Sequence, residues 1–144
     1  MAAKTQTVLG FDFGMKRIGV AVGQTVTATA SPLMTLQAIN GEPRWEEVSK
    51  LVQEWRPDAF VVGIPLNMDG TEQHLTAAAR QFAHTLAKRF TLPAHEMDER
   101  LSTKEVRSRL FAAGGYRALQ KAAIDSFAAQ LIVENWLRLQ KGDK

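Results

Sequence analysis

Two short runs of apolar residues open the chain and predict a pair of neighbouring strands. Residues 8–13 and 18–23 are rich in β-branched and aromatic side chains, and the segment between them contains Gly14, which suits a turn. Residues 27–36 predict a third strand, in which Pro32 indicates a bend or a sheet edge. The chain therefore begins with a predicted three-stranded meander.

Helices then alternate with strands. Apolar residues at helical spacing predict an amphipathic helix over 44–55, and the short apolar run 59–64 predicts a strand buried on both faces. The other predicted elements are a helix capped by Thr71 that ends near Phe90, a strand over 94–97, a helix that a capping box at 102–105 opens, and a final helix over 122–139. A meander followed by this alternation predicts an α/β fold with a mixed sheet and helices on both faces.

Size and composition are those of a globular domain. The chain has 144 residues, of which 45% are hydrophobic and 23% charged, so we expect a single domain over 1–144. The absence of cysteine excludes disulfides and thiolate metal sites and is compatible with a reducing cytoplasm. No apolar run approaches the length of a membrane span, and the first residues are too polar for a signal peptide.

Charge is unevenly distributed along the chain. Residues 1–99 carry 9 Lys and Arg against 11 Asp and Glu, whereas residues 100–144 carry 9 against 4. A basic segment that follows an acidic cluster is typical of proteins that hold a phosphate backbone beside a metal site. A solvated helical surface is the alternative explanation of the same charges.

Asp12 is the first candidate for chemistry. Its carboxylate interrupts an apolar strand beside Phe11 and Phe13, where a charge is costly unless it is paired or binds a metal. Capping of the turn at Gly14 is the structural alternative.

Two further acidic positions lie near the ends of predicted elements. Asp98 and Glu99 follow the last predicted strand, and since neighbouring side chains of a strand point opposite ways, at most one of them faces Asp12. Asp125 lies in the first turn of the final helix. Each acid has a structural alternative, namely a surface pair with Arg100 for Asp98 or Glu99 and a favourable helix N-terminus for Asp125.

Acids gathered from separate elements repel one another unless a cation lies between them. Carboxylate oxygens suit Mg²⁺ or Mn²⁺, and two such ions about 4 Å apart can activate a water and stabilise the leaving oxygen of a phosphodiester. The chain has no cysteine nucleophile, and its three histidines lack the spacing of a zinc site. Metal-assisted hydrolysis is therefore the chemistry that the acids predict.

Four segments in this order make the chain similar to the YqgF (RuvX) family. They are 12–21 (DFGMKRIGVA), 63–72 (GIPLNMDGTE), 98–103 (DERLST) and 121–126 (KAAIDS). The resemblance implies a ribonuclease H-like fold with a five-stranded mixed sheet in the order 3-2-1-4-5. It also implies a cytoplasmic nuclease that matures the 5′ end of precursor 16S ribosomal RNA, with branched DNA as the competing substrate.

Carried over by position, the acidic set of the family falls on Asp12, Glu99 and Asp125. Resolvases of the wider superfamily usually carry an acid on the fourth strand, where this chain has none, so Glu99 on the next strand would replace it. We expect these three residues to be both the metal ligands and the catalytic set. The number of metal ions is left open.

Basic residues near the acids are candidate contacts for substrate phosphates. They are Lys16, Arg17, Arg100, Lys104, Arg117 and Lys121. The expected partner is structured RNA or branched DNA, with ribosomal precursor particles as a further candidate, for a monomer or a homodimer. Solvated surface charge is the alternative for each residue, and a non-catalytic RNA- or ribosome-binding module is the rival function.

Overall fold

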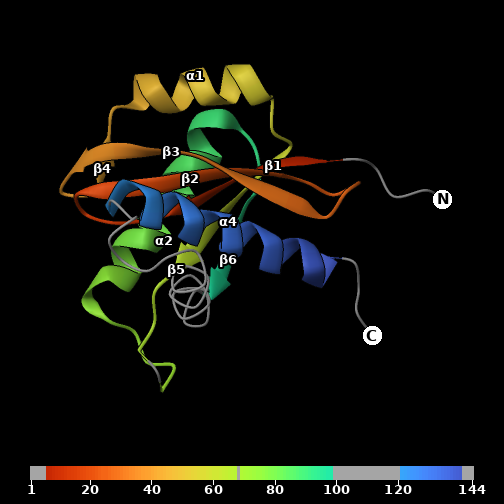
Figure 1. The fold of residues 1–144 in the computed structure, drawn as a ribbon. Coiled ribbons are helices and arrows are strands. Elements are labelled where there is room, and N and C mark those ends of the chain that lie inside the picture. Colours follow the sequence, from red (N-terminus) through yellow and green to blue (C-terminus); the bar gives the residue numbers. More distant parts are fainter. Residues whose placement is uncertain (1–5, 68, 99–120, 141–144) are drawn as a thin grey trace.

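The computed structural model describes residues 6–67, 69–98 and 121–140. These residues form a six-stranded sheet with helices on both of its faces (Figure 1). The strands are β1 (Thr7–Asp12), β2 (Arg17–Gln24), β3 (Thr29–Ile39), β4 (Glu42–Pro43), β5 (Ala59–Ile64) and β6 (Ala94–Asp98). The helices are α1 (Trp45–Trp55), α2 (His74–Phe90) and α4 (Lys121–Gln140).

The sheet is mixed, with the spatial order β4-β3-β2-β1-β5-β6. The strands from β1 to β4 pair antiparallel with one another, whereas β1 pairs parallel with β5 and β5 parallel with β6. The five longer strands thus confirm the expected order. The carboxyl ends of β1, β5 and β6 meet at one edge of the sheet, which is where ligands bind in sheets of this kind.

The expected strand count was too low by one, because β4 is an additional two-residue strand. The sequence pattern marked residues 41–43 only as a break. In the structure Asn40 and Gly41 both have positive φ, at 52° and 82°, which is the backbone of a tight hairpin turn. The chain consequently folds back, and Glu42 and Pro43 pair with the end of β3.

The prediction that Thr71 caps the second helix was wrong. Helix α2 begins at His74 after the N-cap residue Gln73, whose backbone N–H donates to Thr76 Oγ1 over 2.9 Å. Thr71 instead bonds within the preceding loop, where its N–H and hydroxyl both donate to Asp69 Oδ1. The helix is shorter than expected because local polar bonds hold the chain in a loop.

Alternation along β1 builds two cores, one on each face of the sheet. Leu9 and Phe11 are fully buried on the face that α1 and α2 cover, where the rings of Phe11 and Phe82 meet edge to face at 5.5 Å. Val8 is fully buried on the other face, against α4 and Trp136. The two outer helices α1 and α4 accordingly lie on opposite sides of the sheet (Figure 1).

All three tryptophans pack into the two cores. Trp136 is 5% exposed, and Trp45 and Trp55 pack partly buried against the first core. The helix that the capping box at 102–105 was expected to open lies outside the described residues. Within the described part of the chain, no helix is both long and apolar enough to cross a membrane.

Gly10 tests how closely α4 packs on the sheet. A Cβ atom at Gly10 would lie 2.0 Å from Cγ2 of Val133, which is a fully buried and stiff side chain. We expect Gly10→Ala to lower the free energy of unfolding by about 1–3 kcal/mol, measured by urea denaturation. The same change made in a Val133→Ala background should cost clearly less, and an equal cost would contradict this packing.

Candidate active site

Asp12 ends β1 at the edge where the parallel strands finish. It shares the α4 face of the sheet with Val8 and Gly10, four and two residues before it. Its Cα partners on the neighbouring strands are Gly19 of β2 and Gly63 of β5. Because both partners are glycines, no cross-strand side chain competes with the Asp12 carboxylate for space on this face.

Asp125 reaches the same place from α4, more than a hundred residues later. A Cβ atom at Gly19 would lie 2.1 Å from the main-chain carbonyl oxygen of Asp125, so only glycine allows the helix to come this close. Gly19 is the direct antiparallel partner of Asp12, and such partners have Cα atoms about 5 Å apart. The structure therefore brings Asp12 and Asp125 together on one face.

Arg17 binds Asp125 from the beginning of β2. Its Nε donates to Oδ2 of Asp125 over 3.0 Å, and the two side chains are 34% and 23% exposed. Arg17 lies two residues before Gly19 and so points to the same face. An ion pair with this much exposure stabilises the fold by about 1 kcal/mol or less, so the position of Arg17 beside the Asp125 carboxylate matters more than the energy of the pair.

The register of β6 distinguishes Asp98 from its neighbour. Met97 pairs with Gly63 and packs against the core under α4, whereas Asp98 pairs with Ile64, whose side chain belongs to the opposite core. Asp98 thus lies on the α1 and α2 face, away from Asp12. Glu99 lies outside the described residues, and its expected place beside Asp12 stays a prediction.

Two of the three candidate metal ligands, Asp12 and Asp125, lie among the described residues. Across 6–67, 69–98 and 121–140, no three His, Asp or Glu side chains come close enough together to hold a metal ion. Asp12 and Asp125 nevertheless supply hard oxygen donors on one face, which is the donor type that Mg²⁺ and Mn²⁺ take. The donor set fits such an ion, and a third ligand would have to come from outside these ranges, as Glu99 does.

Most of the predicted phosphate contacts also lie beyond what the structure describes. This is so for Arg100, Lys104 and Arg117, and for the side chain of Lys121 at the first position of α4. Lys16 is exposed in the turn between β1 and β2. Among the described candidates, only Arg17 is shown with a carboxylate partner.

A loop held in place by α2 follows β5 at the same edge. Leu66 and Glu72 form a β-bridge across it, and the backbone N–H of Asn67 donates to the carbonyl of Thr71 over 2.8 Å. Arg80 of α2 binds Glu72 at the end of this loop. These contacts join the two ends of the loop and tie it to α2.

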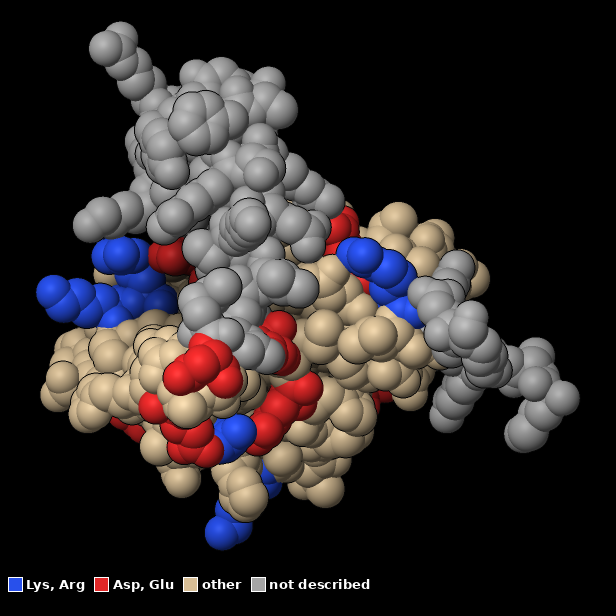
Figure 2. All heavy atoms as spheres, turned by 90° about the horizontal axis from the view of Figure 1, so that it is seen from below, with Lys and Arg blue, Asp and Glu red and all other residues tan. Residues whose placement is uncertain are grey.

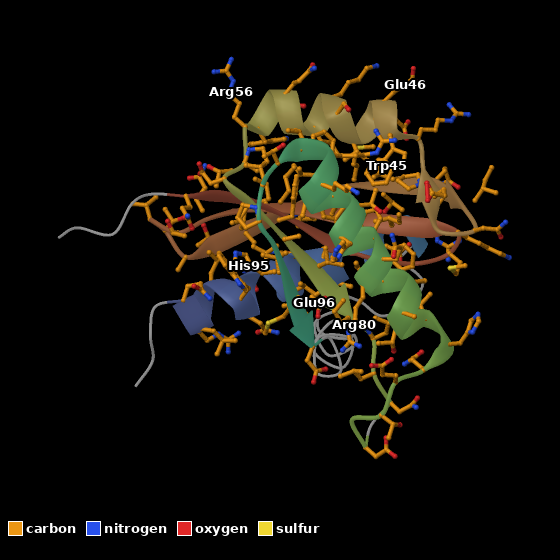
Figure 3. All side chains as sticks on the ribbon, turned by 180° about the vertical axis from the view of Figure 1, so that it is seen from behind. Trp45, Glu46, Arg56, Arg80, His95 and Glu96 are labelled. Atoms are coloured by element: carbon orange, nitrogen blue, oxygen red, sulfur yellow. The ribbon has the colours of Figure 1, made fainter. Side chains whose placement is uncertain are left out.

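Arg80 is a residue that sequence reasoning missed. It binds Glu72, and its Nε atom also lies 3.5 Å from Oε1 of Glu96 of β6. Figure 3 labels Arg80 and Glu96 on their neighbouring elements. The hydrogen bond with Glu72, followed by the charge of that carboxylate, raises the pKa of the Arg80 side chain. No sequence signal marks this network, because its members are an outward-facing helix residue and two acids on separate elements.

Acidic side chains gather on the described part of the face that is seen from below. Figure 2 shows Asp and Glu side chains gathered toward its centre, with Lys and Arg set mostly toward the margins.

Comparison with protein families gives a match over nearly the whole chain. The model of the RuvX family, described as Holliday junction resolvase, matches residues 6–139. A protein of Shewanella oneidensis is 54% identical over 138 residues, covering 96% of this chain and 98% of the relative. One of Aeromonas hydrophila is 51% identical over 138 residues, covering 96% and 99%. Both relatives carry the name "Putative pre-16S rRNA nuclease".

Solved structures agree on the fold. The RuvC protein of Thermus thermophilus in complex with a Holliday junction substrate superposes with a TM-score of 0.57 at 19% identity, covering 96% of this chain and 97% of that one. The fowlpox virus resolvase with Holliday junction DNA gives 0.55 at 10% identity, covering 93% and 98%. These likenesses confirm the expected ribonuclease H-like fold class.

Gly19 is the position to change in order to test this geometry. The obstacle to a Cβ atom there is the main chain of Asp125, which cannot rotate away as a side chain can. We expect Gly19→Ala to destabilise the protein by more than Gly10→Ala does, by roughly 3 kcal/mol in urea denaturation. A Gly19→Ala protein as stable as the unmodified chain would show that α4 does not rest on β2 here.

Proposed function

This chain belongs to the RuvX family, described as Holliday junction resolvases, and we propose that it hydrolyses phosphodiester bonds in nucleic acid with divalent metal ions. The observation that carries the proposal is the close approach of α4 to β2 at Gly19. It gathers two carboxylates from the ends of the chain at the edge of the sheet.

Asp12 and Asp125 would hold the metal, with Glu99 as the third ligand. Bound Mg²⁺ or Mn²⁺ supplies an activated water and neutralises charge on the leaving oxygen. Asp12 is fixed by β1 between two strands, and Asp125 is fixed by a helix packed on the sheet. Rigid elements of this kind keep ligands at constant separation, so little reorganisation accompanies the reaction.

The substrate we propose is the 5′ end of precursor 16S ribosomal RNA, processed in the cytoplasm. It follows from the name of relatives that are more than 50% identical over nearly their full length. Lys16 is the exposed basic residue placed to meet a phosphate, and Arg100, Lys104, Arg117 and Lys121 would extend the contact. Phosphate contacts position a nucleic acid but do not read its bases, so a structured RNA or a ribosomal precursor particle would be selected by shape.

Resolution of branched DNA is the second candidate function. The description of the family and the junction-bound solved structures favour it. A resolvase cuts two strands symmetrically, which would call for a homodimer, whereas trimming one RNA end needs only a monomer. A non-catalytic RNA-binding module differs from both, because it should bind its target equally well in the presence of a chelator.

Asp12→Asn is expected to abolish cleavage while the protein stays folded. Removing a partner of a metal ligand already costs about 10–100-fold, so loss of a ligand should cost at least about 100-fold. The measurement is cleavage of precursor 16S RNA and of a four-way DNA junction with Mn²⁺, beside a thermal melt of each protein.

Asp98→Asn is the matched control, because Asp98 is an acid at the same edge that belongs to the opposite face. It should leave cleavage within a few-fold of the unmodified protein. Full metal-dependent cleavage by Asp12→Asn, or equal loss in both variants, would contradict the assignment. The substrate that is cut decides between RNA and branched DNA.

A further inference from the structure

We propose that Arg17 is a positioning residue that shares the Asp125 carboxylate with the metal ion and thereby weakens metal binding until substrate is present. The inference rests on the proposed function, because it concerns the same carboxylates. It assigns to Arg17 a role toward Asp125 instead of the direct phosphate contact that its sequence position suggested.

The geometry of the pair carries the first step. The Arg17 Nε atom is bound to Oδ2 of Asp125 at 3.0 Å, which is a charge-assisted hydrogen bond of normal length. One oxygen of the carboxylate is thus engaged, and Asp125 is left to bind an ion through Oδ1. The guanidinium also selects the rotamer of Asp125, since both side chains project from backbone that Gly19 brings into contact.

Electrostatics gives the second step. A guanidinium cannot lose its charge in the physiological range, so a divalent ion at Asp125 always meets a neighbouring positive charge. Charges of +1 and +2 that lie about 6 Å apart repel each other even at the dielectric constant of water, and this repulsion lowers the binding constant of the ion roughly tenfold. The positive charge of Arg17 therefore lowers the affinity of Asp125 for a divalent ion.

The phosphate supplies the missing negative charge. Mg²⁺ in proteins is usually bound by one or two carboxylates together with oxygens of the substrate phosphate. With Arg17 in place, the carboxylates alone would bind the ion weakly. A phosphodiester at the site adds negative charge and would raise the affinity for the ion. The metal ion and the nucleic acid should accordingly raise the affinity of the protein for each other. In the absence of substrate, less metal would be bound and less water would be activated.

Titration of the full-length protein with Mn²⁺ in a calorimeter, without nucleic acid, tests the proposal. Arg17→Gln should bind Mn²⁺ about tenfold more tightly than the unmodified chain, because the opposing charge is gone. Arg17→Lys, which keeps the charge, should stay within about twofold. Lys50→Gln removes an equal charge from an exposed position of α1, on the opposite face of the sheet, and should change the Mn²⁺ affinity by no more than about twofold.

A second arm repeats the titration with a non-cleavable phosphorothioate RNA bound. The Mn²⁺ affinity of the unmodified protein should rise by more than that of Arg17→Gln. The ion pair contributes little to folding, and a thermal melt without metal checks that each variant is folded. Arg17→Met serves as a second neutral variant should Arg17→Gln melt early.

The outcomes separate this proposal from the function on which it rests. Equal or weaker Mn²⁺ binding by both neutral variants, with binding by the unmodified chain still dependent on Asp12, overturns the role of Arg17 alone. Failure of the unmodified chain to bind Mn²⁺, with or without RNA, overturns the metal-dependent nuclease and the role of Arg17 together. Tighter binding by Arg17→Gln and unchanged binding by Arg17→Lys supports the proposal.

Discussion

The contact between α4 and β2 at Gly19 is the constraint on which the candidate site depends. The main chain at Asp125 rests where a side chain of β2 would otherwise be, and no residue larger than glycine leaves room for it. Since Gly19 is paired with Asp12, one close approach joins the first strand of the chain to its last helix. Further along the same interface, Gly10 and Gly23 let Val133 come equally near the sheet. The glycines of β1 and β2 therefore set the distance between α4 and the sheet.

Much of the fold could be predicted because hydrophobic alternation reports burial directly. The apolar run of β5 is buried at all six positions, as a strand covered on both faces requires. The sequence-based predictions were wrong where hydrogen bonds of polar side chains or backbone dihedral angles determine the structure. Strand β4 depends on two left-handed residues at Asn40 and Gly41, and the start of α2 depends on bonds from Thr71 to Asp69. Neither feature changes the hydrophobic pattern, so the pattern could not show it.

The candidate site was predictable to a similar depth. Asp12 could be singled out because a carboxylate in an apolar strand is costly unless it is paired or binds a metal. The structure places it on the same face of the sheet as Asp125. The choice between Asp98 and Glu99 needed the register of β6, which a single sequence does not supply. The Arg17 pair joins residues 108 positions apart, and the Arg80 network joins a helix, a loop and a strand. Contacts of this kind follow from the packed fold and leave no local trace in the sequence.

In the proposed site, negative charge is concentrated at the edge of the sheet and would be partly neutralised, first by Arg17 and then by a divalent ion. The proposal requires this ion to bind between Asp12 and Asp125. Anomalous diffraction from crystals grown with Mn²⁺ would locate the ion. We expect a peak about 2.1 Å from an oxygen of each carboxylate. A well-ordered site without such a peak, or a peak bound elsewhere on the molecule, would contradict it.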